Sequence, residues 1–295
     1  MISSKLLMIF IDGLGVGKND AQINPLAKFP EIWPCEGHSP SLPDLHHTVL
    51  DACLGVQGLP QSATGQTALL TGINAAQILG KHLQGFPSKR LIRMLEQHSV
   101  FLQLQRRGFS ATFANAYRHP EDIKPTSRLS VTSHALRASQ QPFRSVQQIA
   151  ERQALYHDFT NRTLTATNYS APIFTPKEAA SVLVGLANQH HFTLYEYFLT
   201  DVVAHRGDSG QIEAYIAEVT RFVKTIFEIA DTGNLTVILT SDHGNIEDLT
   251  TRTHTRNPVP LLWMNPTDRF PVRLPQDITG VTPLVVKLLC DSASV

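Results

Sequence analysis

The segment Leu235-Thr-Val-Ile-Leu-Thr-Ser-Asp-His-Gly-Asn245 joins an apolar, strand-like run to an Asp-His pair of the type that binds divalent metals. Two other apolar runs end in the same way. Leu6–Ile11 is followed by Asp12, and Phe192–Thr200 is followed by Asp201. Because ligands bind beyond the carboxyl ends of parallel strands, we expect these side chains to meet at one edge of a sheet.

Helical patterns alternate with the strand-like runs. Apolar residues repeat at three- and four-residue steps over Gln211–Ala230, and Thr175-Pro176-Lys-Glu178 has the form of a capping box with proline at the first helical position. A further helix is expected over Thr282–Cys290. The remaining expected strands are Val49–Leu54, Ala111–Ala116 and Val259–Met264. This alternation predicts an α/β fold, a three-layer sandwich with a mostly parallel central sheet.

Residues 118–170 have a different composition from the rest of the chain. They are rich in Ser, Gln, Arg and Thr and contain few long apolar runs. We expect them to form a small inserted cap, and residues 1–117 and 171–295 to form the core. A long disordered loop is the alternative, against which Phe143, Val146, Ile149 and Leu155 argue.

Composition limits the partners and the compartment. With 25 Lys+Arg and 25 Asp+Glu, the chain of 295 residues has no net charge, so we expect neither a nucleic-acid nor a membrane partner. Three separate cysteines and no long apolar run predict a cytoplasmic protein without disulfides. Residues 81–152 carry 12 Lys and Arg against 4 Asp and Glu, which suits an anionic substrate or is simply a solvated face. The oligomeric state stays open.

The carboxylates and histidines favour two metal sites. Asp201 and His205 are four residues apart, so one helical turn places both on one face. Asp242 and His243 are adjacent, and the glycine that follows allows a turn in which both side chains serve one site. His254 lies in a loop before an expected strand. Each motif alone is common, but the set of ligand types suits Mn²⁺ or Zn²⁺.

The loop Pro60–Gly72 offers a nucleophile. It opens an expected helix, and Ser62 or Thr64 would stand at the helix N-terminus, where free N–H groups and the helix dipole favour anions. A hydroxyl in that position can attack phosphorus. The alternative is an ordinary Ser or Thr helix cap.

Taken in order, these motifs resemble the alkaline phosphatase superfamily, most closely the metalloenzyme branch of cofactor-independent phosphoglycerate mutases and phosphopentomutases. Thr240–Asn245 and His254–Pro260 carry the closest similarity. The resemblance implies an alkaline phosphatase-like fold with two divalent metal ions, Mn²⁺ or Zn²⁺. It assigns the ligands of one metal to Asp201, His205 and His254, and those of the other to Asp12, Asp242, His243 and the Ser62 oxygen. It makes Ser62 the nucleophile, with Thr64 as the alternative.

The resemblance also implies phosphoryl transfer through a phosphoserine. The chain lacks the arginine-bearing motifs by which the mutases hold phosphoglycerate, and Gln66 stands where they carry histidine. We therefore expect a phosphomonoesterase acting on a small phosphorylated metabolite of the cytoplasm. A phosphomutase, a phosphodiesterase, or an inactive metal-binding interaction protein are the alternatives. Candidate substrate-binding residues, chosen by position and charge, are Lys81, His82, Arg118 and Arg206.

Overall fold

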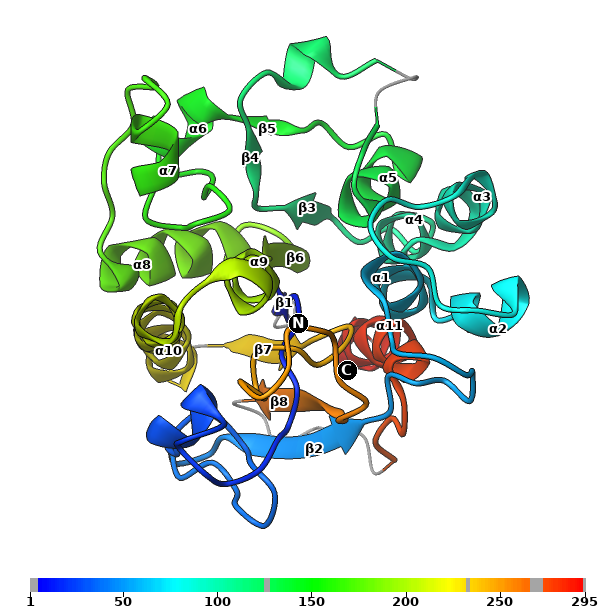
Figure 1. The fold of residues 1–295 in the computed structure, drawn as a ribbon. Helices are drawn as coiled ribbons and strands as arrows, with labels where there is room; N and C mark the ends of the chain where they lie inside the picture. The colour runs from blue at the N-terminus through cyan, green and yellow to red at the C-terminus, as the bar shows by residue number, and fades with distance from the viewer. Residues whose placement is uncertain (1–4, 125–127, 232–233, 266–272, 294–295) are drawn as a thin grey trace.

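The computed structural model describes residues 5–124, 128–231, 234–265 and 273–293. Its centre is a six-stranded sheet with helices on both sides (Figure 1), so the predicted α/β sandwich is confirmed. The strands of this sheet, in spatial order, are β2 (His46–Leu50), β8 (Val259–Met264), β7 (Leu235–Thr240), β1 (Lys5–Ile11), β6 (Phe192–Tyr197) and β3 (Ala111–Phe113). The pairs β7–β1, β1–β6 and β6–β3 are parallel, whereas β8 runs antiparallel to both of its neighbours. A separate parallel pair joins β4 (Ala116–Tyr117) to β5 (Arg144–Ser145).

Helices cover both faces of the sheet. In chain order the α-helices are α1 (Ser62–Thr71), α2 (Ala75–Leu79), α3 (Lys89–His98), α4 (Val100–Gln105), α5 (Val131–Ala138), α6 (Val146–Ala150), α7 (Arg162–Thr165), α8 (Pro176–Ala187), α9 (Leu199–Arg206), α10 (Ser209–Asp231) and α11 (Val281–Ala293). Short 3-10 helices are η1 (Pro25–Lys28), η2 (Pro120–Asp122) and η3 (Ile278–Gly280). The helix predicted over Gln211–Ala230 is confirmed, and so is the capping box of Thr175 and Glu178.

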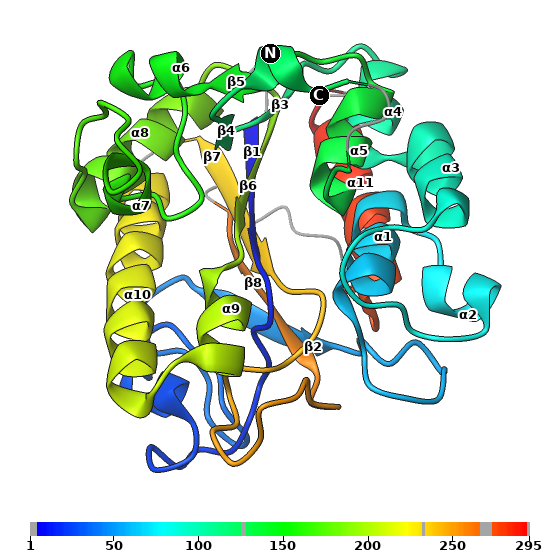
Figure 2. The same ribbon diagram turned by 45° about the horizontal axis from the view of Figure 1, so that its top comes forward.

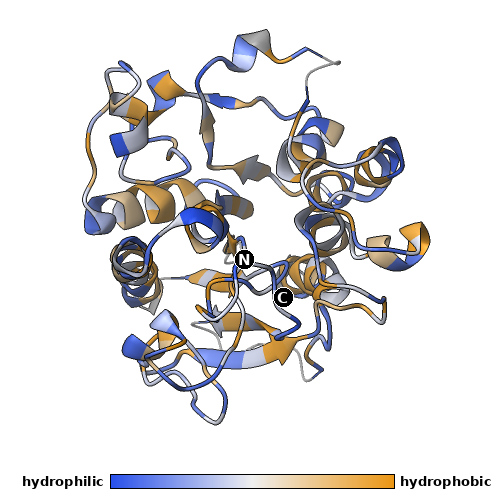
Figure 3. Cartoon of the chain, viewed as in Figure 1, coloured by the Kyte–Doolittle hydropathy of each residue, from blue (hydrophilic) through white to orange (hydrophobic). Residues whose placement is uncertain are grey.

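The apolar run of β1 is buried on both faces. Leu7, Ile9 and Ile11 join the hydrophobic cluster under α8 and α10, and the even-numbered residues of the strand join the cluster under α1, α3 and α11. Side chains alternate along a strand, so a strand covered on both sides must be apolar throughout. Figure 3 shows the same hydrophobic character along β7 and β8 in the interior.

Three expected strands differ in their boundaries from the sequence prediction. The strand expected over Ala111–Ala116 is divided between β3 of the central sheet and β4 of the separate pair. The run from Phe192 was expected to stay extended to Thr200, but β6 ends at Tyr197 and α9 begins at Leu199. Asp201 therefore stands in the first turn of a helix and not at the end of a strand. The strand expected at Val49–Leu54 is β2 at His46–Leu50. Alternating apolar residues alone do not fix where a strand stops, because tertiary packing decides the ends.

Residues 118–170 pack onto both faces of the core. Leu136 of α5 belongs to the cluster under α1, whereas Ile149 and Phe159 belong to the cluster under α8. Figure 2 shows α5 beside α3 and α4 on one side of the sheet, and α6 and α7 beside α8 on the other. The division of the chain into core and cap stays a prediction.

Within the described ranges, none of the helices combines the length and the hydrophobicity that a bilayer crossing requires.

Candidate metal centre

Three parallel strands deliver the predicted ligands to one edge of the sheet. Ile11 pairs with Tyr197 of β6, and Phe10 pairs with Thr240 of β7, so the chain leaves the sheet at the same level in all three strands. Asp12 follows β1, Asp242 follows β7, and β6 leads into α9, as Figure 2 shows. The main chain of Asp12 is tied to α9, because the Thr200 hydroxyl donates a hydrogen bond to its carbonyl oxygen. The convergence expected from the sequence is present.

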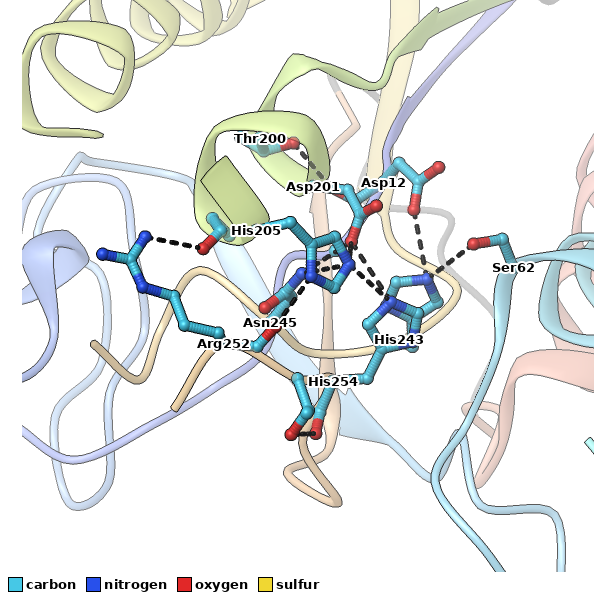
Figure 4. A network of polar contacts seen from close by, with 12 residues as sticks. Asp12, Ser62, Thr200, Asp201, His205, His243, Asn245, Arg252 and His254 are labelled. Atoms are coloured by element: carbon cyan, nitrogen blue, oxygen red, sulfur yellow. Dashed lines mark hydrogen bonds and ion pairs between the residues drawn. The ribbon is translucent and has the colours of Figure 1, made fainter. Parts of the chain in front are cut away.

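Asp201, His205 and His254 form the outer cluster. Nε2 of His205 and Nε2 of His254 each lie 3.4 Å from Oδ1 of Asp201 and 3.1 Å from each other. Nδ1 of His205 lies 2.7 Å from the main-chain carbonyl oxygen of Arg252, and Nδ1 of His254 lies 2.8 Å from that of Pro60. Nδ1 therefore carries the proton, and each Nε2 presents a lone pair to its neighbours. Two lone pairs and a carboxylate at such distances suit a cation between them (Figure 4).

Asp12, Asp242, His243 and Ser62 form the inner cluster. Nε2 of His243 lies 3.2 Å from Oδ1 of Asp12, 3.5 Å from Oδ2 of Asp242 and 3.1 Å from Oγ of Ser62. Asp201 also lies within metal-binding reach of Asp12 and His243, so this carboxylate stands between the two clusters. The sequence had given Asp201 to the outer cluster alone.

The ionisation of the inner cluster indicates an excess of buried negative charge. Burial and the charge of Asp242 raise the pKa of Asp12 to about 7. Burial also raises the pKa of Asp242. For His243, burial favours the neutral ring, but the charges of Asp242 and Asp12 outweigh it and raise the pKa to about 10. Such shifts show that the surroundings favour an added positive charge at the position of His243 Nε2.

Unpaired buried atoms fit a bound cation. Among the described residues, Asp12 Oδ1, Asp242 Oδ2 and Asn245 Oδ1 are buried oxygen atoms of the site without a hydrogen-bond donor. Buried polar atoms are normally paired, and an unpaired carboxylate oxygen is costly. Carboxylate oxygen and imidazole nitrogen are ligands for Zn²⁺ or Mn²⁺. The residues present therefore fit two divalent ions.

Ser62, rather than Thr64, faces the inner cluster. Ser62 is the first residue of α1, and its neighbour Gln61 makes no side-chain cap. The Thr64 hydroxyl is buried, donates to the carbonyl of Gln61 and accepts from the N–H of Leu83. Its own N–H donates to the carbonyl of Leu83, so the main-chain amide of Thr64 is already paired.

Gly65 allows α1 to approach the metal ligands. A Cβ atom at this position would lie 2.8 Å from the main-chain oxygen of Asp242, closer than real Cβ contacts. Gln66, one residue further, donates from Nε2 to Oδ2 of Asp12 at 3.1 Å. The sequence had marked Gln66 only as a departure from the mutases, whereas the structure gives it a contact with a ligand. The hydrogen bond leaves the other oxygen of Asp12 free for the cluster.

Sequence reasoning missed the residues that support the ligands. Asn245 donates to Oδ1 of Asp201, and Arg252 donates to the carbonyl of Gly207 at the end of α9. Glu247 accepts from the N–H groups of Gly15 and Asn245 and from the Thr255 hydroxyl, joining three loops. The only sequence signal for them is that they lie in the loops that also carry the ligands.

A buried carboxylic acid lies close to Asp12. Oε2 of Glu196 accepts a hydrogen bond of 2.6 Å from the Thr132 hydroxyl. Burial, opposed by that hydrogen bond, raises the pKa of Glu196 to about 7, and the charge of Asp12 adds to the rise. The sequence gave no sign of this residue, because it occupies a position inside an apolar strand.

The four candidate substrate residues lie in three places. Lys81 and His82 line a cavity of about 340 Å³ with Gln61, next to Ser62 in sequence. The Arg118 guanidinium lies over the rings of Tyr156 and Tyr169. Arg206 is exposed at the end of α9, next to His205. Their role in binding substrate stays a prediction.

Comparisons with known proteins agree with this geometry. A family model described as the metalloenzyme superfamily matches residues 4–281. In sequence, the 2,3-bisphosphoglycerate-independent phosphoglycerate mutase of Gracilaria tenuistipitata var. liui is 27% identical over 110 residues, which are 35% of this chain and 22% of that protein. A similar mutase of Anaplasma marginale is 26% identical over 109 residues, also 35% of this chain and 22% of that protein. The sequence match thus spans about a fifth of the length of either curated relative.

Solved structures share the fold over nearly the whole chain. The cold-active alkaline phosphatase of Shewanella sp. covers 96% of this chain and 99% of its own, with a TM-score of 0.54 and 13% identity. The phosphoglycerate mutase of Leishmania mexicana covers 98% of this chain and 96% of its own, with a TM-score of 0.51 and 12% identity. At such low identity these likenesses establish the architecture, which matches the fold class predicted from the sequence.

Proposed function

The chain belongs to the metalloenzyme superfamily, and from this membership and the geometry of the metal centre we propose that it transfers phosphoryl groups through a phosphoserine at Ser62. The observation that carries the proposal is the contact of 3.1 Å between Oγ of Ser62 and Nε2 of His243, at the point where two carboxylates meet. A serine oxygen held in a cluster of metal ligands is an activated nucleophile. If Ser62 served only as a helix cap, its hydroxyl would not need to lie beside His243.

The protein's own residues position both the nucleophile and the phosphate. Ser62 attacks phosphorus, a new P–O bond forms on its oxygen, and the bond to the departing alcohol breaks. No hydrogen bond from the main-chain N–H of Ser62 or Ala63 is found in the described part of the chain, so these groups and the dipole of α1 are available to the phosphate oxygens. Two divalent ions, when bound, supply positive charge that lowers the pKa of the attacking hydroxyl or water and stabilises the departing oxygen.

Hydrolysis is the outcome that the surroundings favour. The side chain of His205 is 35% exposed and that of Asp201 is 18% exposed. Ser62 itself is only partly buried, so water can reach the phosphoserine. We therefore propose a phosphomonoesterase acting on a small phosphorylated metabolite. A mutase must exclude water while the phosphoryl group is held.

A phosphomutase is the second candidate. The sequence likeness to two phosphoglycerate mutases favours it, although the likeness covers only a part of those proteins. Incubation with a sugar bisphosphate separates the two activities. A stable phosphoserine at residue 62 with no phosphate release supports the mutase, whereas phosphate release at a steady rate supports the phosphatase.

Hydrolysis of p-nitrophenyl phosphate with added Mn²⁺ or Zn²⁺ tests the nucleophile. The Ser62→Ala variant should lose at least about a thousandfold in turnover, because the covalent route is removed. Thr64→Val is the matched variant and should keep activity within about tenfold, because the Thr64 hydroxyl bonds to the main chain of Gln61 and Leu83 and not to the metal ligands. Mass spectrometry after acid quench should find the phosphoryl group on Ser62. Full activity of Ser62→Ala would refute the proposal, and absence of bound metal would leave an interaction protein.

A further inference from the structure

Asn245 lies in contact with the outer cluster and has no role so far in the proposed chemistry. It is 1% exposed, and Figure 4 shows its amide beside the ends of Asp201 and His205. Its Nδ2 is 2.7 Å from Oδ1 of Asp201 and 3.2 Å from Nε2 of His205. Its Oδ1 is buried and has no donor. One end of this side chain thus meets two ligand atoms, and the other end is unpaired.

The distances match those within a coordination shell. Two ligands at 2.0–2.1 Å from a tetrahedral ion are about 3.4 Å apart. The separations within the outer cluster are 3.1 and 3.4 Å, and the amide of Asn245 adds contacts of 2.7 and 3.2 Å to two of its members. The amide of Asn245 thus contacts two of the three members of the outer cluster, and its distance to His205 is close to the separation of two ligands on one ion.

The orientation of the amide depends on the charge at that position. Without a cation, the NH₂ end must face the Asp201 carboxylate and the His205 lone pair, because an amide oxygen would be repelled by both. With a cation among them, the oxygen end is attracted instead. The nitrogen and oxygen of an amide have nearly the same shape, so a half-turn of the side chain exchanges them with little movement of neighbours.

The main chain of Asn245 is held in place by the Glu247 carboxylate. Its N–H donates to Oε2 of Glu247 at 2.7 Å, and the same carboxylate accepts from the Asn257 side chain and the Thr255 hydroxyl of the loop that carries His254. Gly244 lies against this carboxylate, since a Cβ there would be 2.3 Å from Oε1 of Glu247. A fixed main chain delivers the amide to one place, which a ligand needs.

We propose that Asn245 is the fourth protein ligand of the outer cluster, binding the metal through Oδ1 together with Asp201, His205 and His254. The proposal rests on the two-metal function above. A carboxylate, an amide oxygen and two imidazoles supply two oxygen and two nitrogen ligands, a set that suits either Mn²⁺ or Zn²⁺.

Calorimetric titration of the metal-free protein with Mn²⁺ tests the role of Asn245 without measuring activity. The wild type should bind two equivalents. In Asn245→Ala the affinity of the outer cluster should fall at least about tenfold, while the inner cluster keeps its affinity. Asn245→Asp retains an oxygen ligand and should bind Mn²⁺ at least as tightly as the wild type. Thr250→Ala, at an exposed position of the loop that carries Asn245 and with a hydroxyl that donates to Asp248, is the control and should match the wild type.

Each outcome decides a different point. Unchanged Mn²⁺ affinity in Asn245→Ala would overturn the proposal. Equal weakening in Asn245→Ala and Asn245→Asp would also overturn it, because it would show that Asn245 acts only as a hydrogen-bond donor to Asp201. A wild type that binds no metal would refute the proposed function itself. If Asn245→Ala fails to fold, as judged by circular dichroism, the near-isosteric Asn245→Asp still separates ligand from donor.

Discussion

The inner and outer clusters use the same ligand types but are built in different ways. In the inner cluster, Asp242 and His243 are fully buried and follow a central strand directly. In the outer cluster, Asp201 and His205 are partly exposed and lie on the eight-residue helix α9, while His254 comes from a loop. The inner cluster is therefore positioned by the sheet, and the outer cluster is assembled by contacts between α9 and the loops.

This difference predicts different behaviour of the two metals. The buried, mutually repelling carboxylates of the inner cluster hold a cation that water cannot easily replace. A metal in the outer cluster, beside the partly exposed Asp201 and His205, exchanges more freely. We expect a chelator to remove the outer metal first. Such a division suits catalysis in which the inner metal keeps Ser62 in place and the outer metal serves the departing oxygen and water.

The largest effect should come from removing one ligand of each cluster. Asp242→Asn should lose the inner metal, and His254→Ala the outer metal, so that each variant retains one equivalent after dialysis. Turnover of p-nitrophenyl phosphate should fall at least about a thousandfold in both, because each ion supplies several kcal/mol of transition-state stabilisation. Elemental analysis of the dialysed proteins measures the stoichiometry. Loss of both metals from His254→Ala would show that the inner and outer clusters do not bind their metals independently.

A smaller effect should come from loosening only the outer cluster. The Arg252 side chain donates to the carbonyl of Ala204 within α9 and to the carbonyl of Gly207 just after it. The main-chain carbonyl of Arg252 faces Nδ1 of His205. In Arg252→Ala the loop is no longer anchored to α9, so metal affinity of the outer cluster should fall about tenfold. Calorimetric titration measures both sites, and the exposed Arg256→Ala is the control. Equal weakening of the inner cluster would contradict the difference drawn above.

The last effect concerns the buried carboxylic acid of Glu196 beside the inner cluster. Glu196 has a folded pKa of about 7 against an ordinary value of 4.5. The folded protein therefore holds a proton that the unfolded chain releases between these values, and the stability it contributes is complete below pH 4.5 and lost as the pH rises through 7. In metal-free wild type this loss should amount to roughly 2–3 kcal/mol of unfolding free energy.

Urea titrations of metal-free protein between pH 4.5 and 8 measure this contribution. Glu196→Gln carries no titrating proton, so its stability should fall less over that range than the stability of the wild type. The difference should shrink when metal is added, because cations at Asp12 oppose the negative potential. Parallel stability curves for the two proteins would show that burial does not raise the pKa of Glu196.

The sequence determined the fold class and the ligand types because both depend on local patterns. Apolar runs followed by Asp12, Asp242 and His243 specify buried strands with polar ends, and Thr175 with Glu178 specifies a helix start. These patterns arise from side-chain periodicity and capping, which act over a few residues. Family motifs added the order of the ligands along the chain.

Only the tertiary structure decided how the ligands are grouped and supported. The place of Asp201 between the clusters, the contact of Gln66 with Asp12, the burial of Glu196 and the position of Asn245 each depend on residues 40 or more positions apart, or on the angle at which a helix meets the sheet. Local periodicity holds no information about such distances. They are set when hydrophobic burial on both faces of the sheet fixes α1 and α9 against the strand ends.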